Sequence, residues 1–206
     1  MSTDADPLAT DPWANVLDDL AAGRVVVVPT DTVYGLAVIA EDAGGVASLF
    51  RLKSRDTGRP MAVLVADVAQ ARAIGRFDRL ATRLAERFWP GGLTLIVPRA
   101  AGFDARLGGD RVTVGIRCPN HDQLRALLDR SGPLAVTSAN LSGGPTGATA
   151  AEVAEVFGAG VSSVVDGGTL AGVASTVVDC CGDIPEVLRE GPVSREYLRA
   201  AIADLI

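Results

Sequence analysis

Histidine and cysteine are scarce in this chain of 206 residues, and each shortage argues against a class of site. The single histidine, His121, cannot build a zinc site that needs several imidazoles, and a Ser-His-Asp triad would depend on it alone. The three cysteines, Cys118 and the adjacent Cys180 and Cys181, match no C-x-x-C or zinc-knuckle spacing, which favours reduced thiols in the core. We therefore expect no protein-bound metal, and we assign His121 and the cysteines to packing.

Long apolar runs and a positive net charge are also missing. No apolar run approaches the ~20 residues that a membrane-spanning helix needs. The N-terminal segment has neither the basic start nor the apolar core of a secretory signal. These features predict a cytoplasmic protein with no membrane partner. The formal charge of -6 and the aromatic content of 4% argue against a broad nucleic-acid surface, so any phosphate group would need a local basic cluster.

The apolar content is sufficient for one domain, since 48% of the residues are hydrophobic. Residues 1–10 lack periodicity and predict a flexible tail, which leaves a single domain over residues 11–206. Short apolar runs predict strands at residues 25–28, 61–65, 93–97, 112–116, 134–136, 161–165, 176–178 and 186–188. Helical patterns with N-cap signals predict helices over residues 12–23, 67–74, 80–88, 120–130 and 149–156 and from 194 onward.

The interleaving of these elements predicts an α/β fold with an open twisted sheet. Residues 25–28 are all valine, as expected for a central strand that is packed on both faces. Some neighbouring runs are joined by too little chain for a helical crossover and must be antiparallel. The predicted sheet is therefore mixed, with parallel and antiparallel pairs and flanking helices.

Four segments carry polar side chains beside predicted strands: 29–36 (PTDTVYGL), 53–60 (KSRDTGRP), 137–146 (TSANLSGGPT) and 174–177 (ASTV). Loops at strand ends in an open α/β sheet collect at the crevice where ligands bind. No G-x-x-x-x-G-K-[ST] loop is present, and no G-x-G-x-x-G follows the first apolar run. The four segments predict one shared site that would bind a nucleotide by another design.

The segment 53–60 holds the only lysine, Lys53, together with Arg55 and Arg59. Three cations within seven residues suit a triphosphate, although a solvated helix end would have the same composition. In 29–36, Thr30 and Thr32 are equally consistent with a small polar ligand and with a local turn.

The segment 137–146 combines four hydroxyls, Asn140 and two glycines, which favours ligand binding. One of these hydroxyls belongs to Ser142. The short segment 174–177 is a weak signal by itself, since an ordinary strand entry would share it.

Seven motifs in order give this chain a resemblance to the YrdC-like threonylcarbamoyl-AMP synthases. They stand at residues 29–36, 53–55, 89–94 (WPGGLT), 114–121 (VGIRCPNH), 138–143 (SANLSG), 166–168 (DGG) and 175–177 (STV). The resemblance covers residues 14 to 199 and implies an α/β fold with a concave ligand-binding face. It also implies an enzyme that joins L-threonine, bicarbonate and ATP into L-threonylcarbamoyl-AMP and releases pyrophosphate.

The resemblance further implies the biological setting. The product would serve N6-threonylcarbamoyladenosine formation at position 37 of tRNAs that read ANN codons. A separate tRNA threonylcarbamoyl transferase complex would receive it, so direct RNA binding would be weak or absent. Mg²⁺ would be bound through the phosphates of ATP and not by protein ligands.

Site residues follow from the same resemblance. The catalytic pair would be Lys53 and Arg55. The nucleotide would be bound by Arg55, Arg59, Thr113, Ser138, Asn140, Thr146 and Arg189. The threonine pocket would comprise Thr30, Thr32, Arg117, Val136 and Ser175.

Three positions depart from the family pattern, namely Ala174, Asp56 and the pair 147–148 after Thr146. Two other functions are compatible with the same motifs. One is a carbamoyltransferase domain that forms carbamoyl-adenylate, and the other is a double-stranded RNA-binding module.

Overall fold

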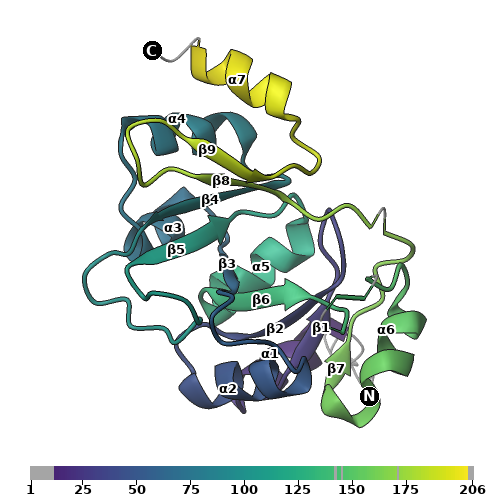
Figure 1. Cartoon of the computed structure of the whole chain (residues 1–206). Helices are drawn as coiled ribbons and strands as arrows, with labels where there is room; N and C mark the ends of the chain where they lie inside the picture. Colours follow the sequence, from purple (N-terminus) through teal and green to yellow (C-terminus); the bar gives the residue numbers. More distant parts are fainter. Residues whose placement is uncertain (1–11, 142, 145, 171, 204–206) are drawn as a thin grey trace, which may run out of the picture.

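The computed structural model describes residues 12–141, 143–144, 146–170 and 172–203. The expected tail over residues 1–10 and the hydroxyl of Ser142 lie outside the described residues. Within the described part, the elements form one mixed sheet with helices on its two faces (Figure 1).

The sheet has the strand order β7-β1-β2-β6-β3-β5-β4-β8-β9 in the part of the chain that the structure describes. The strands are β1 Val26–Val28, β2 Gly35–Ile39, β3 Ala62–Leu64, β4 Leu93–Pro98, β5 Thr113–Arg117, β6 Leu134–Ser138, β7 Ser163–Val164, β8 Thr176–Asp179 and β9 Glu186–Arg189. The pairs β1/β7, β3/β5 and β4/β8 are parallel, and the other five are antiparallel. The predicted mixed open sheet is confirmed.

Seven α-helices are described, with a short 3-10 turn, η1 Gly158–Gly160, after the sixth. They are α1 Pro12–Ala21, α2 Ala43–Leu52, α3 Val68–Ile74, α4 Arg79–Phe88, α5 Asp122–Ser131, α6 Ala150–Phe157 and α7 Arg195–Ala203. In Figure 1, α4 and α7 lie at the β8/β9 end of the sheet, whereas α1, α2 and α6 lie at the β1/β7 end.

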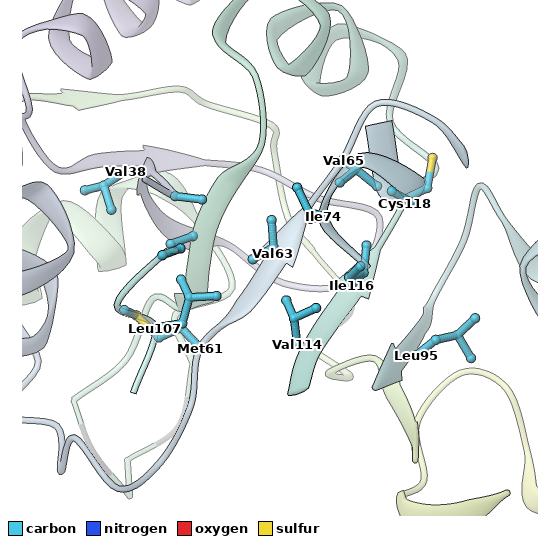
Figure 2. Packing of buried hydrophobic residues seen from close by; sticks show 14 of the residues in the cluster. Val38, Met61, Val63, Val65, Ile74, Leu95, Leu107, Val114, Ile116 and Cys118 are labelled. Atoms are coloured by element: carbon cyan, nitrogen blue, oxygen red, sulfur yellow. The ribbon is translucent and has the colours of Figure 1, made fainter. Parts of the chain in front are cut away.

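Two apolar clusters lie on opposite faces of the sheet, because successive side chains of a strand alternate between the faces. The larger cluster packs one face against α2, α3, α4, α6 and α7. Figure 2 shows part of it, where Val63 of β3 and Ile116 of β5 lie near Ile74 of α3. The smaller cluster packs the other face against α1 and α5 and includes Leu64 and Leu134.

All eight predicted strands are present, but the sequence interpretation missed β2 and α2. The helix α2 begins with Ala43, Gly44 and Gly45, and glycine has a low helix propensity. It is held by Asp42, whose side chain accepts a hydrogen bond from the Gly44 amide, and by burial of Val46, Leu49 and Phe50. Tertiary packing therefore decides this helix against its local propensity.

Two further expectations need correction. The N-cap of α5 is His121 and not Asn120, and the Nδ1 atom of His121 accepts a hydrogen bond from the Leu124 amide at 3.2 Å. Among the cysteines, Cys118 and Cys180 are buried as expected, but Cys181 is exposed. Burial raises the pKa of Cys118 to about 11 and that of Cys180 to about 12, so both remain protonated thiols near neutral pH.

Candidate functional site

A cavity of about 390 Å³ opens on one face of the sheet and is lined by residues from seven of its strands and the loops beside them. Alternate residues of each strand point into it, for example Thr94 and Ile96 of β4 and Thr113, Gly115 and Arg117 of β5. The helices α1 and α5 cover the neighbouring part of the same face, where Leu64 and Leu134 pack. The cavity is therefore the part of this face that the helices leave open.

The lining is strongly cationic although the chain has a net charge of -6. Six cations line the cavity: Lys53, Arg55, Arg59, Arg99, Arg117 and Arg189. No carboxylate occurs among the described lining residues. Cations that are gathered in a cleft in excess of carboxylates focus a positive potential there, which favours an anionic ligand.

Lys53 lies deeper than the sequence indicated. It is the C-cap of α2, not part of a loop after a strand, and only 2% of its surface is exposed. Its Nζ donates hydrogen bonds to Oγ1 of Thr137 at 3.0 Å, to the carbonyl oxygen of Ser138 at 2.6 Å and to Oδ1 of Asn140 at 3.0 Å. The lysine therefore ties the end of α2 to the end of β6 and to Asn140 beyond it, and a solvated helix end is excluded.

Burial, together with the positive charges of Arg55 and Arg59, lowers the pKa of Lys53 from 10.5 to about 8. Arg55 in turn orders its own loop, because its Nε donates to the carbonyl oxygen of Arg59 and its Nη2 to that of Pro60, both at 2.9 Å. Burial also lowers the pKa of Arg55. The segment 53–60 therefore concentrates positive charge at one end of the cavity.

Arg117 is the last residue of β5 and connects three of the sequence motifs. Its Nε donates to the carbonyl oxygen of Gly91 at 2.9 Å, its Nη1 to Oγ1 of Thr32 at 2.7 Å and its Nη2 to Oδ1 of Asp31 at 2.5 Å. The Oγ1 atoms of Thr32 and Thr30 are 2.9 Å apart, so the network continues to a second cavity hydroxyl. Burial lowers the pKa of Arg117, and the Asp31 carboxylate opposes this shift.

Ser175 joins the cavity from the loop that precedes β8. Its Oγ lies 2.8 Å from Oγ1 of Thr94 and accepts a hydrogen bond from Nη2 of Arg189 at 3.2 Å. Nε of Arg189 also donates to the carbonyl oxygen of Ser175, at 2.9 Å. This contact places Arg189 beside the Ser175 hydroxyl, which the family resemblance assigned to the threonine pocket.

The structure brings together nearly all of the residues singled out in the sequence. Those that line the cavity are Thr30, Thr32, Lys53, Arg55, Arg59, Thr113, Arg117, Val136, Ser138, Asn140, Ser175 and Arg189. Thr146 does not line it. Asn140 is held between Oγ of Ser138, which donates to its Oδ1 at 2.6 Å, and the carbonyl oxygen of Gly144, which accepts from its Nδ2 at 2.6 Å.

The sequence analysis missed several residues of the cavity. Thr94 was part of the WPGGLT motif but had no assigned role, although it contacts Ser175. Arg99 belonged to no motif, and its only sequence signal was a cation two residues after the predicted strand 93–97. Its Nε donates to the carbonyl oxygen of Thr113 at 2.8 Å and its Nη1 to that of Ala105 at 2.6 Å, so it also holds the loop before β5.

Neither a metal centre nor a membrane span is found in the described part of the chain. No group of three or more His, Cys, Asp or Glu side chains could hold a metal ion among the residues that the structure describes. None of the described helices has the length and apolar character to cross a bilayer.

Comparison with known proteins gives consistent matches. The family model Sua5_yciO_yrdC, described as telomere recombination, matches residues 18–191. The threonylcarbamoyl-AMP synthase of Bacillus subtilis (strain 168) is 40% identical over 190 residues, which are 90% of this chain and 55% of that protein.

Two solved structures share the fold. Sua5 of P. abyssi complexed with L-threonine has a TM-score of 0.88 at 34% identity, covering 93% of this chain and 58% of that one. YciO of E. coli has a TM-score of 0.81 at 28% identity, covering 87% of this chain and 89% of that one. The chain thus spans little more than half the length of the B. subtilis and P. abyssi proteins.

Proposed function

The chain belongs to the Sua5_yciO_yrdC family, whose model spans residues 18–191, and on that premise we propose that it makes L-threonylcarbamoyl-AMP from L-threonine, bicarbonate and ATP. Pyrophosphate is the second product. The proposal draws on the B. subtilis relative that is named for this activity and on the P. abyssi structure that contains L-threonine.

The observation that carries the proposal is the division of the cavity into two chemically different ends. Lys53, Arg55 and Arg59 supply positive charge at one end, and Arg117 with the Thr30 and Thr32 hydroxyls forms the other. A triphosphate requires the first arrangement, and a small polar amino acid fits the second. The cavity volume of about 390 Å³ lies within the range of small-molecule sites.

In the proposed reaction, the amine nitrogen of threonine first bonds to the carbon of bicarbonate while a C–O bond of bicarbonate breaks, which gives N-carboxy-threonine and water. A carboxylate oxygen of that group then bonds to the α-phosphorus of ATP, and the bond from this phosphorus to the bridging oxygen breaks, releasing pyrophosphate. Two anions must be brought in line and the growing negative charge neutralised, so fixed cations contribute more than a strong general base. We assign Lys53 and Arg55 to that neutralisation, and this agrees with a lining that lacks histidine.

The nucleotide and amino-acid contacts are assigned to the cavity residues in the same way. Arg59, Thr113, Ser138, Asn140 and Arg189 would surround the nucleotide. The contact from Thr146 would require that residue to approach the cavity. Threonine would lie among Thr30, Thr32, Arg117, Val136 and Ser175.

Mg²⁺ fits this site only as a companion of the triphosphate. The described lining offers neutral oxygens, such as those of Ser138 and Asn140, and no carboxylate. No step is assigned to the ion. We further propose that the protein works in the cytoplasm and that a separate tRNA threonylcarbamoyl transferase complex consumes the adenylate.

Pyrophosphate release by the purified protein tests the proposed function directly. Threonine and bicarbonate are each supplied or omitted, and the adenylate is identified by mass. We expect release only when ATP, threonine and bicarbonate are all present. Release with carbamoyl phosphate in place of threonine and bicarbonate would support carbamoyl-adenylate formation instead. No release, together with salt-dependent retention of double-stranded RNA, would support the RNA-binding function.

The pKa of Lys53 predicts how nucleotide binding depends on pH. The ammonium is present below about pH 8 and is lost as the pH rises through that value, because the pKa in the folded protein is lowered from 10.5. We expect the affinity for a non-hydrolysable ATP analogue to be constant from about pH 6.5 to 7.5 and to weaken above about pH 8, by up to about tenfold per pH unit. Isothermal titration without threonine, at constant ionic strength, measures this directly.

The control for this titration is the Lys53→Met variant, which should bind more weakly but without the decline above pH 8. An affinity of the unmodified protein that stays constant to pH 9.5 would exclude a nucleotide contact of the Lys53 ammonium.

A further inference from the structure

Gly115 lies in the middle of the row of β5 residues that face the cavity, between Thr113 and Arg117. Alternate residues of a strand that share a face are about 6.7 Å apart. The row therefore has a hydroxyl at one end, a guanidinium at the other and no side chain between them. This is the boundary between the two ends of the cavity.

The fold does not require glycine at this position. An added Cβ would lie 3.5 Å from Cγ2 of Thr94 and 3.8 Å from Cγ1 of Ile96, which are ordinary van der Waals distances. Gly115 is also not among the described glycines with positive φ. At Gly35 the situation differs, because an added Cβ would lie 2.7 Å from Cγ1 of Val136.

A glycine inside a strand lowers stability relative to a residue with a side chain, since it loses more conformational freedom on folding. At Gly35 the packing against Val136 leaves no room for a side chain and accounts for the lower stability of a glycine. At Gly115 the packing gives no such reason. What Gly115 provides is open space in the cavity floor, beside Thr94 and Ile96.

We propose that Gly115 controls the approach of the two substrates, because it forms the floor of the junction where the amino acid meets the nucleotide. The inference rests on the proposed function, which places threonine at the Arg117 end and the nucleotide at the Thr113 end. An oxygen of the N-carboxy group of threonine must reach the α-phosphorus directly above this floor. The bridging oxygen of the pyrophosphate leaves from the opposite side of that phosphorus. A methyl group on the floor separates the reacting groups without removing any group that binds either substrate.

Two substitutions at this position test the inference, Gly115→Ala and the larger Gly115→Val. A displacement of about 1 Å in a reacting pair lowers the rate about 10²-fold. We expect Gly115→Ala to lower kcat for pyrophosphate release about 10²-fold, and Gly115→Val to lower it further. The dissociation constants of the ATP analogue alone and of threonine alone, measured by titration, should stay within about threefold of the unmodified protein for Gly115→Ala.

Gly182→Ala is the matched control. Gly182 lies in the turn between β8 and β9, has no positive φ, and an added Cβ would meet nothing closer than 3.8 Å. This variant should retain full turnover. Thermal melting of all three variants then separates loss of folding from loss of reaction.

Each result has a defined meaning. Unchanged kcat in Gly115→Ala would overturn the inference. So would a loss of binding of one substrate alone that matches the loss of turnover, because Gly115 would then lie under a single subsite. A Gly115→Ala variant that melts well below the unmodified protein would show that the fold requires the glycine. Failure of the unmodified protein to release pyrophosphate would instead overturn the proposed function, whatever the variants do.

Discussion

Lys53→Ala is expected to lower kcat/KM for ATP about 10²- to 10³-fold, which is the cost of removing one fixed donor from developing negative charge. It is also expected to lower the free energy of unfolding by about 1–3 kcal/mol, because the substitution leaves buried and partly buried acceptors without this donor. Those acceptors are the carbonyl oxygen of Ser138, Oδ1 of Asn140 and Oγ1 of Thr137. Steady-state pyrophosphate release and urea unfolding measure the two effects separately.

Arg51→Ala is the matched control, because Arg51 lies in the last turn of the same helix, is exposed and contacts only Ser48 among the printed partners of its side chain in the described structure. It should change the unfolding free energy by less than about 0.5 kcal/mol and leave turnover unchanged. Unchanged turnover in Lys53→Ala would remove the lysine from the site. Unchanged stability would show that the contacts of its Nζ contribute nothing net to the fold.

The effect on stability could not be predicted from the sequence. A lysine between two arginines is typical of a solvated segment, and only the tertiary structure places it under the segment that follows β6. The sequence did predict that Lys53, Asn140 and Ser175 share a site, because all three belong to polar segments that interrupt an α/β pattern. It did not predict that Lys53 and Asn140 bond directly.

Elements with a clear local signal were predictable, whereas β2 and α2 were not. Valine-rich and alternating runs identify strands by their own composition, and even the two-residue β7 falls inside a predicted run. The helix α2 has no such signal, because Gly44 and Gly45 stand in its first turn. Since Lys53 caps this helix, missing it also hid the burial of the lysine.

Thr146 and Arg99 show the limits of assigning sites by motif. Thr146 belongs to a predicted binding segment but does not line the cavity, because membership of a motif does not determine the path of the loop. Arg99 lines the cavity without belonging to any motif, since it reaches the site through the end of β4 and its contacts with the backbone of the loop before β5.

The ion pair between the buried Arg117 and the partly exposed Asp31 leads to the second large expected effect. The Arg117 side chain is 6% exposed and that of Asp31 is 17% exposed. We expect Arg117→Gln to lower the free energy of unfolding by about 3 kcal/mol, the lower end of the cost of breaking a buried pair, because the Asp31 carboxylate retains some access to water. The pair Arg83–Glu86, whose side chains are 53% and 58% exposed, is the control, and Arg83→Gln should cost less than about 1 kcal/mol in the same urea titrations.

The same substitution, Arg117→Gln, should impair the use of threonine much more than the binding of the nucleotide. Arg117→Gln is expected to lower kcat/KM for threonine about 10²-fold, since truncating a buried charged contact costs about 2–5 kcal/mol, whereas the affinity for the ATP analogue should change less than about threefold. Adding Asp31→Asn removes the uncompensated carboxylate, so the double variant should recover part of the stability but none of the threonine use. Recovery of both would mean that Arg117 acts only by holding the loop that contains Thr32, and equal losses for threonine and ATP would contradict its place at the amino-acid end of the cavity.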